Sequence, residues 1–83
     1  TFNTAEEARN IISDLRIQLK RLPYNPDLLK LCNNIGEMNS NLSRLEVEAR
    51  QTHKTHKLDA HKEDMIKAIK HLEHLILMAK LMA

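Results

Sequence analysis

Apolar residues recur along most of this chain at alternating intervals of three and four, and this spacing restricts the possible folds more than any other feature. An α-helix completes a turn in about 3.6 residues, so side chains spaced in this way share one side of a helix and need another helix to cover them. The first such stripe consists of Ala5, Ala8, Ile12, Leu15, Leu19 and Leu22. The repeat predicts an all-α chain whose helices pack through heptad stripes.

The first helix has a recognisable start. Thr4 is followed three positions later by Glu7, which is the capping-box pattern in which each side chain bonds a free backbone N–H of the first turn. We therefore expect a helix over residues 4–22.

Two prolines separate the first helix from the second. Pro23 disfavours further helix, whereas Asn25 followed by Pro26 is typical of a helix start. A second helix is predicted over residues 26–50, with Gly36 weakening its middle because glycine costs about 1 kcal/mol relative to alanine. The stripe of this helix is Leu28, Leu31, Ile35, Met38, Leu42, Leu45 and Ala49.

A third helix is predicted over residues 57–82, and its stripe is out of phase with the second. The offset of two residues corresponds to a rotation of about 200° at roughly 100° per residue, so the apolar side changes within residues 50–57. Either a turn or one long helix facing two partners would satisfy this change, and we favour the turn. The third stripe is Leu58, Met65, Ala68, Leu72, Leu75, Ala79 and Met82, with His61 at a position where the pattern calls for an apolar residue.

Length and composition limit how stable such a fold can be alone. The chain has 83 residues, one Phe, one Tyr and no Trp, so the aromatic side chains that anchor small cores are scarce. Cys32 is the single cysteine, which excludes an internal disulfide. We expect one helical domain over residues 1–83, a small antiparallel bundle or a long coiled-coil hairpin, completed by oligomerisation.

The last turns of the third helix are apolar around much of their circumference. A single hairpin cannot cover such a surface, so we expect a second copy of the chain or a partner protein to bind it. The alternative is that the first helix covers part of it within a three-helix bundle. The predicted protein interface consists of Leu72, Leu75, Ile76, Leu77, Met78, Leu81 and Met82.

The segment HKTHKLDAHK, residues 53–62, lies where the apolar stripe changes sides. A polar, charged segment without a stripe is typical of a solvated junction between helices, which is the reading we favour. Histidines three residues apart, at 53 and 56 and again at 71 and 74, can approach one ion on a helix. Two ligands do not complete a site, so no metal and no cofactor is predicted.

Basic residues around this junction give a second reading, in which an oligomer binds nucleic acid through phosphate contacts. Asp59, Glu63 and Asp64 lie among these residues, and no aromatic side chain is present there to stack on a base. The reading is therefore an alternative to the protein interface. The possible nucleic-acid contacts are Arg50, Lys54, Lys57, Lys62, Lys67 and Lys70.

Catalytic motifs are missing from the sequence. It has no glycine-rich phosphate loop, no paired cysteines and no familiar nucleophile arrangement, so we do not expect an enzyme. Thirteen Lys and Arg against eleven Asp and Glu give too even a balance for a dedicated nucleic-acid binder. With neither a signal-like start nor an apolar run of about 20 residues, a soluble cytoplasmic protein is expected.

The segment PYNPDLLKLCNNIGEMN, residues 23–39, resembles the Pro-x-x-Pro turn and following helix of type III secretion needle subunits. The resemblance covers about a fifth of the chain, and the third helix extends beyond the end of a needle subunit. It implies a helical hairpin that polymerises. We expect a non-enzymatic assembly or adaptor protein that self-associates and binds protein partners, such as a component of a phage or secretion-type machine.

Overall fold

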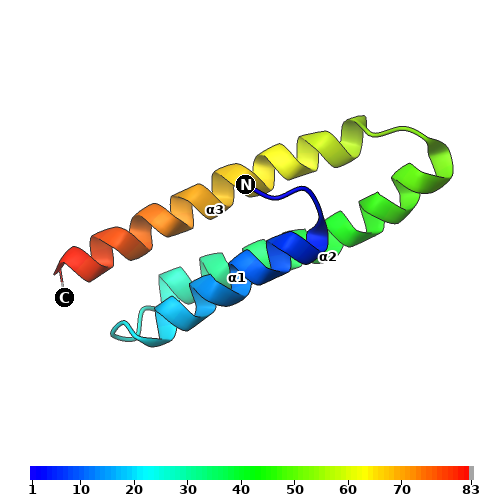
Figure 1. The fold of residues 1–83 in the computed structure, drawn as a ribbon. Helices are drawn as coiled ribbons and strands as arrows, with labels where there is room; N and C mark the ends of the chain where they lie inside the picture. The colour runs from blue at the N-terminus through cyan, green and yellow to red at the C-terminus, as the bar shows by residue number, and fades with distance from the viewer. Residues whose placement is uncertain (83) are drawn as a thin grey trace.

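The computed structural model describes residues 1–82 and consists of three α-helices. They are α1 (Ala5–Lys20), α2 (Pro26–Thr52) and α3 (His56–Met82), and no strand occurs within residues 1–82. Both α1 and α3 run antiparallel to α2, so they run in the same direction as each other (Figure 1). This confirms the all-α fold and the small helical bundle.

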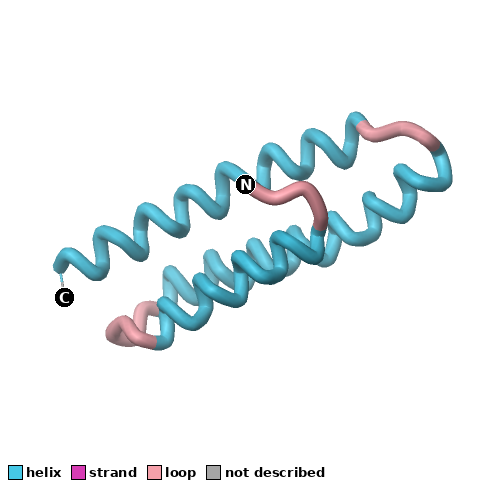
Figure 2. Tube along the Cα trace, viewed as in Figure 1, coloured by secondary structure: helices cyan, strands magenta, loops and turns pink. Residues whose placement is uncertain are grey.

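The first helix is much shorter than the other two, and this difference determines the shape of the molecule. α1 has 16 residues, whereas α2 and α3 have 27 each. At 1.5 Å per residue, α1 is about 24 Å long and its neighbours about 40 Å. Figures 1 and 2 show that α1 starts well short of the turn between α2 and α3, so that end of the bundle is a two-helix hairpin. The whole chain measures 48 × 18 × 16 Å.

Helix ends follow the capping residues that the sequence contains. Glu7 N–H donates to Thr4 Oγ1 at 3.2 Å, which confirms the start of α1. At the start of α2, Asn25 Oδ1 accepts from the backbone N–H groups of Asp27 and Leu28 at 3.1 and 3.3 Å. One free N–H donor in the first turn of α1 and two in the first turn of α2 are therefore satisfied by the neighbouring cap residue.

The apolar stripe changes sides between α2 and α3 because the chain turns there. This is the option that we favoured over one long helix. His53 closes α2 in the left-handed conformation, with φ 59° and ψ 22°, and its N–H donates to the Ala49 carbonyl at 2.8 Å. The Thr55 carbonyl accepts from Asp59 N–H at 2.8 Å and begins α3. Histidine is one of the residues enriched in the left-handed region, so the turn forms without glycine or proline.

The core runs between all three helices. The first predicted stripe is confirmed, because every member is buried except the half-buried Leu22. The core residues are Phe2, Ala5, Ala8, Ile12, Leu15, Leu19, Leu28, Cys32, Ile35, Leu42, Met65, Ile69, Leu72 and Ile76.

The stripes of α2 and α3 are rotated relative to the prediction. In α2, Cys32 and Asn39 are buried, whereas Leu31, Met38 and Leu45 are only partly buried. The reason is that α2 contacts α1 on one side and α3 on the other, so its most buried line lies between the two contacts.

In α3, the most buried line runs through Met65, Ile69, Leu72 and Ile76. Ala68, Leu75 and Ala79 from the predicted stripe flank this line and are half-buried, and Met82 is exposed. Ile69 and Ile76 are buried because α3 contacts α1, and the residues that precede α1, in addition to α2.

Phe2 fills the space between α1 and α3. The residues before α1 pass over to α3 (Figure 1), and Phe2 is buried there beside Ile11, Ile66 and Ile69. One aromatic ring thus replaces much of the direct contact between these two helices. The heptad pattern starts at Ala5 and contains no signal for this contact.

Candidate interaction surfaces

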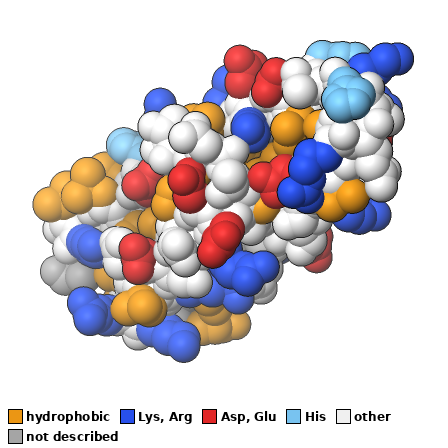
Figure 3. All heavy atoms as spheres, turned by 45° about the vertical axis from the view of Figure 1, so that its right-hand side comes forward, with side chains coloured by type: hydrophobic (Ala, Val, Ile, Leu, Met, Phe, Trp, Pro, Cys, Tyr) orange, Lys and Arg blue, Asp and Glu red, His pale blue; other side chains and the backbone are white. Residues whose placement is uncertain are grey.

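The end of α3 carries exposed apolar side chains that the bundle leaves uncovered. We name the group formed by Leu77, Met78, Leu81 and Met82 the C-terminal apolar surface. Their exposed fractions are 54, 44, 73 and 84% respectively. Figure 3 shows apolar side chains gathered at this end of the molecule. Large apolar side chains exposed side by side are typical of a protein interface.

Helical geometry explains which residues of this segment are free. Leu72 and Ile76 face the core and are fully buried, and Leu75 is half-buried. Leu77 and Leu81 lie roughly 110° and 150° around the helix from the buried line, on the outer side. The interface prediction is thus corrected for Leu72 and Ile76, which the chain's own core covers.

Other exposed apolar side chains lie at the same end of the bundle. Ile17 near the end of α1, Tyr24 in the following connection and Leu29 in the first turn of α2 are all exposed there. Lys80 Nζ donates to Gln18 Oε1 at 2.8 Å and ties this end of α3 to α1. Val47, on α2, is the one exposed large apolar residue of residues 1–82 that lies toward the other end.

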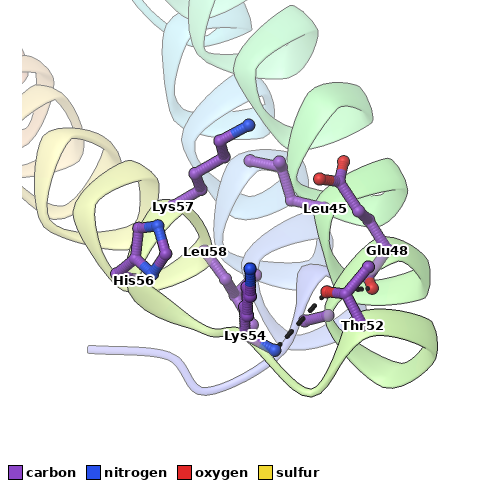
Figure 4. A pocket seen from close by; sticks show the side chains of 8 residues that line it. Leu45, Glu48, Thr52, Lys54, His56, Lys57 and Leu58 are labelled. Carbon is purple, nitrogen blue, oxygen red and sulfur yellow. Dashed lines mark hydrogen bonds between the residues drawn. The ribbon is translucent and has the colours of Figure 1, made fainter.

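The opposite end is the polar tip of the α2–α3 hairpin. A cavity of about 280 Å³ opens there between the end of α2 and the start of α3 (Figure 4). Its walls combine the acidic Glu48 with the basic Lys54 and Lys57, and the Lys54 N–H donates to Thr52 Oγ1 at 3.4 Å. Such a mixed, open lining fits the favoured reading of a solvated junction.

Histidines of the chain do not converge. Within residues 1–82 no three His, Cys, Asp or Glu side chains are placed to hold a metal ion. His61 is half-buried, and its Nε2 lies 2.7 Å from the Met38 carbonyl oxygen of α2. This contact gives His61 a packing role at the stripe position where an apolar residue was expected.

The possible nucleic-acid contacts do not form one continuous stripe. Arg50, Lys54 and Lys57 lie around the hairpin tip, whereas Lys67 and Lys70 lie on the middle of α3. Lys57 and Lys62 are five residues apart, which places them about 140° apart around α3. Lys62 is also partly buried. Nucleic-acid binding stays a prediction, and this distribution of charge does not favour it.

Comparison of the chain with models of known protein families, with curated protein sequences and with solved structures yields no match. None of the helices in residues 1–82 has the length and apolar character needed to cross a membrane.

Proposed function

We propose that this protein is a non-enzymatic assembly or adaptor subunit that self-associates through the C-terminal apolar surface. The observation that carries the proposal is the exposure of Leu77, Met78, Leu81 and Met82 on the last two turns of α3. Their positions, i, i+1, i+4 and i+5, form the kind of face through which two helices pack.

Burial of this surface is strongly favourable. Moving a leucine or methionine from water into a packed interface contributes roughly 1.5–3 kcal/mol, so four such residues can offset part of the entropic cost of association. The members of the surface carry no charge, so a second copy meets no like-charge repulsion from them. In a two-fold arrangement, the C-terminal apolar surface of each copy covers that of the other copy. Both surfaces are then buried in a single interface.

The small size of the core supports the same proposal. A chain of 83 residues with one Phe and one Tyr gains limited stability from its own core. Association adds buried apolar area without lengthening the chain. As for the class of assembly, the resemblance of residues 23–39 to needle subunits supports a secretion-type machine, and a phage structure is the second possibility.

The test measures molar mass by light scattering coupled to size exclusion, over a range of concentrations and salt. We expect the wild type to form a discrete oligomer that neither salt nor a chelator dissociates. Leu81→Asp should shift it to the monomer. The matched control is Val47→Asp, which also places an acid at an exposed apolar position and should remain oligomeric. A wild type that is monomeric at every concentration contradicts self-association.

A further inference from the structure

The connection between α1 and α2 forms one tip of the molecule, and apolar side chains are exposed around it (Figure 1). The exposed fractions of Ile17, Tyr24 and Leu29 are 50, 81 and 37%. Tyr24 is the single tyrosine of the chain and lies in the connection itself, between Pro23 and the residue that caps α2. We name the group formed by Ile17, Lys20, Arg21, Tyr24, Leu29 and Lys30 the α1–α2 tip.

A groove beside Tyr24 adds to the apolar surface of the tip. It lies between the last turn of α1 and the first turn of α2, and its volume is about 240 Å³. Leu19, Leu22 and Pro23 form part of its wall, together with Tyr24 and Leu29. The apolar surface of the tip is therefore larger than its three exposed side chains.

The net charge of the chain is concentrated at the same tip. Residues 17–30 contain the basic Lys20, Arg21 and Lys30 against the single acidic Asp27, whereas the rest of the chain contains ten basic and ten acidic side chains. Asp27 lies in the first turn of α2, where the helix dipole attracts its negative charge. Lys80 Nζ, which donates to Gln18 Oε1 at 2.8 Å, places a further positive charge beside the end of α1.

Apolar and basic side chains are mixed on this part of the surface, as Figure 3 shows at the end that also carries the C-terminal apolar surface. A partner that fits must accept apolar side chains and supply negative charge over the same area. The surface of an anionic lipid bilayer does both, because acyl chains lie directly beneath charged headgroups.

The shape of the tip favours a bilayer over an acidic protein. The molecule measures 48 × 18 × 16 Å, and the connection projects from one narrow end of it (Figure 1). A folded partner needs a hollow that matches such an end, whereas the fluid headgroup region of a bilayer opens around it. Tyrosine is also suited to this boundary, because its ring is apolar and its hydroxyl is polar.

We propose that the α1–α2 tip binds the surface of an anionic lipid bilayer. Tyr24 enters the boundary between headgroups and acyl chains, with Leu29 and Ile17 beside it. The basic side chains of the tip lie against the anionic headgroups. The C-terminal apolar surface takes no part in this contact, so the proposal goes beyond self-association and does not depend on it.

The experiment is cosedimentation of the full chain with lipid vesicles. One set consists of phosphatidylcholine alone, and the other of phosphatidylcholine and phosphatidylserine in equal amounts. We expect the anionic vesicles to bind the chain at least tenfold more tightly, and added salt to weaken this binding, because salt screens the charges.

Tyrosine fluorescence shows whether the tip itself makes the contact. The chain has one Tyr and no Trp, so its tyrosine emission reports on Tyr24 alone. Anionic vesicles should protect this emission from acrylamide in the water, and lipids with brominated acyl chains should quench it. Vesicle-bound protein whose Tyr24 emission responds to neither would contradict insertion of the tip.

A charge variant and its control separate the tip from general surface charge. Lys20→Gln together with Arg21→Gln should weaken binding to anionic vesicles at least tenfold, since each basic residue near such a surface contributes roughly a factor of five. Lys67→Gln together with Lys70→Gln is the matched control, because it removes the same charge from exposed lysines in the middle of α3. The control should bind as the wild type does.

An apolar pair of variants tests the other half of the contact. Tyr24→Ser should weaken vesicle binding several-fold, and Val47→Ser, at an exposed apolar position toward the other end of the bundle, should leave it unchanged. The substituted side chains of both pairs are exposed, so the variants should fold, and circular dichroism checks that they do.

Three results would overturn the proposal: no binding to anionic vesicles, equal binding to neutral ones, or equal losses in a variant and its control. Binding to polyglutamate with none to anionic vesicles would assign the tip to an acidic protein instead. Leu81→Asp should still prefer anionic vesicles, and Lys20→Gln with Arg21→Gln should keep the molar mass of the wild type. Failure of bilayer binding and failure of self-association can thus be told apart.

Discussion

Asn39 and Glu46 lie one heptad apart on α2, and their side chains bond the backbone carbonyl and the backbone N–H of the same residue, Ala5, at the start of α1. Asn39 Nδ2 donates to the Ala5 carbonyl at 3.0 Å, and Glu46 Oε2 accepts from the Ala5 N–H at 3.1 Å. The first N–H groups of a helix have no partner within it, and a carboxylate there also interacts favourably with the helix dipole. The pair therefore sets how far α1 lies along α2.

Glu46→Ala should lower the free energy of unfolding by about 1 kcal/mol, because it removes the acceptor of the Ala5 N–H. Glu46→Gln keeps an acceptor oxygen and should lose less. Glu48→Ala is the control, since the Glu48 side chain is exposed and lines the pocket at the tip of the α2–α3 hairpin. Urea unfolding followed by circular dichroism measures all three. Equal losses in Glu46→Ala and Glu48→Ala would show that the contact contributes nothing.

Asn39→Asp should destabilise the fold by roughly 2–4 kcal/mol at neutral pH, since it buries a carboxylate against the Ala5 carbonyl oxygen. The burial raises the pKa of the new carboxyl in the folded state, so the unfolded state loses its proton first as pH rises. The penalty therefore grows above the unfolded pKa and shrinks in acid. Urea midpoints of variant and wild type at acidic and neutral pH check this, and a difference that is independent of pH contradicts it.

His53→Gly should raise the free energy of unfolding by roughly 0.5 kcal/mol. A left-handed conformation costs an L-residue about 1–2 kcal/mol, whereas glycine adds only about 0.4–1 kcal/mol of unfolded-state entropy. His53→Val should have the opposite effect, because β-branched residues are strongly disfavoured there. Thermal unfolding of the two variants beside the wild type is the measurement. A destabilised glycine variant would mean that the histidine side chain itself stabilises the turn.

Phe2→Ala should lower the free energy of unfolding by about 3 kcal/mol, because it empties the space between α1 and α3. Tyr24→Ala is the aromatic control, and its exposed ring should have little effect on stability. The melting temperature of each variant distinguishes the two sites. If both variants melt like the wild type, Phe2 does not belong to the core in solution.

Local signals could be read from the sequence, and contacts between distant segments could not. Thr4 and Asn25 cap their helices through backbone groups within three residues, so their roles follow from spacing alone. Glu46 lies 41 residues from the N–H that it caps, and nothing near it in the sequence points to α1. Phe2 precedes the first heptad stripe, and its burial depends on how α1 and α3 approach.

The candidate sites follow the same division. Exposure of Leu77 and Leu81 could be expected from an apolar helix end, whereas the burial of Ile76 required knowledge of which side faces α2.

The short α1 has a consequence for how this molecule tolerates change. Beyond Glu46, α2 continues to Thr52 without α1 beside it, and α3 returns from His56 (Figure 1). Backbone amides in this two-stranded arm should exchange with solvent faster than those of the three-helix body. Adding seven residues to each side of the arm keeps every side chain on its original face. The arm can therefore change in length without rearranging the three-helix body, whose opposite end carries the C-terminal apolar surface.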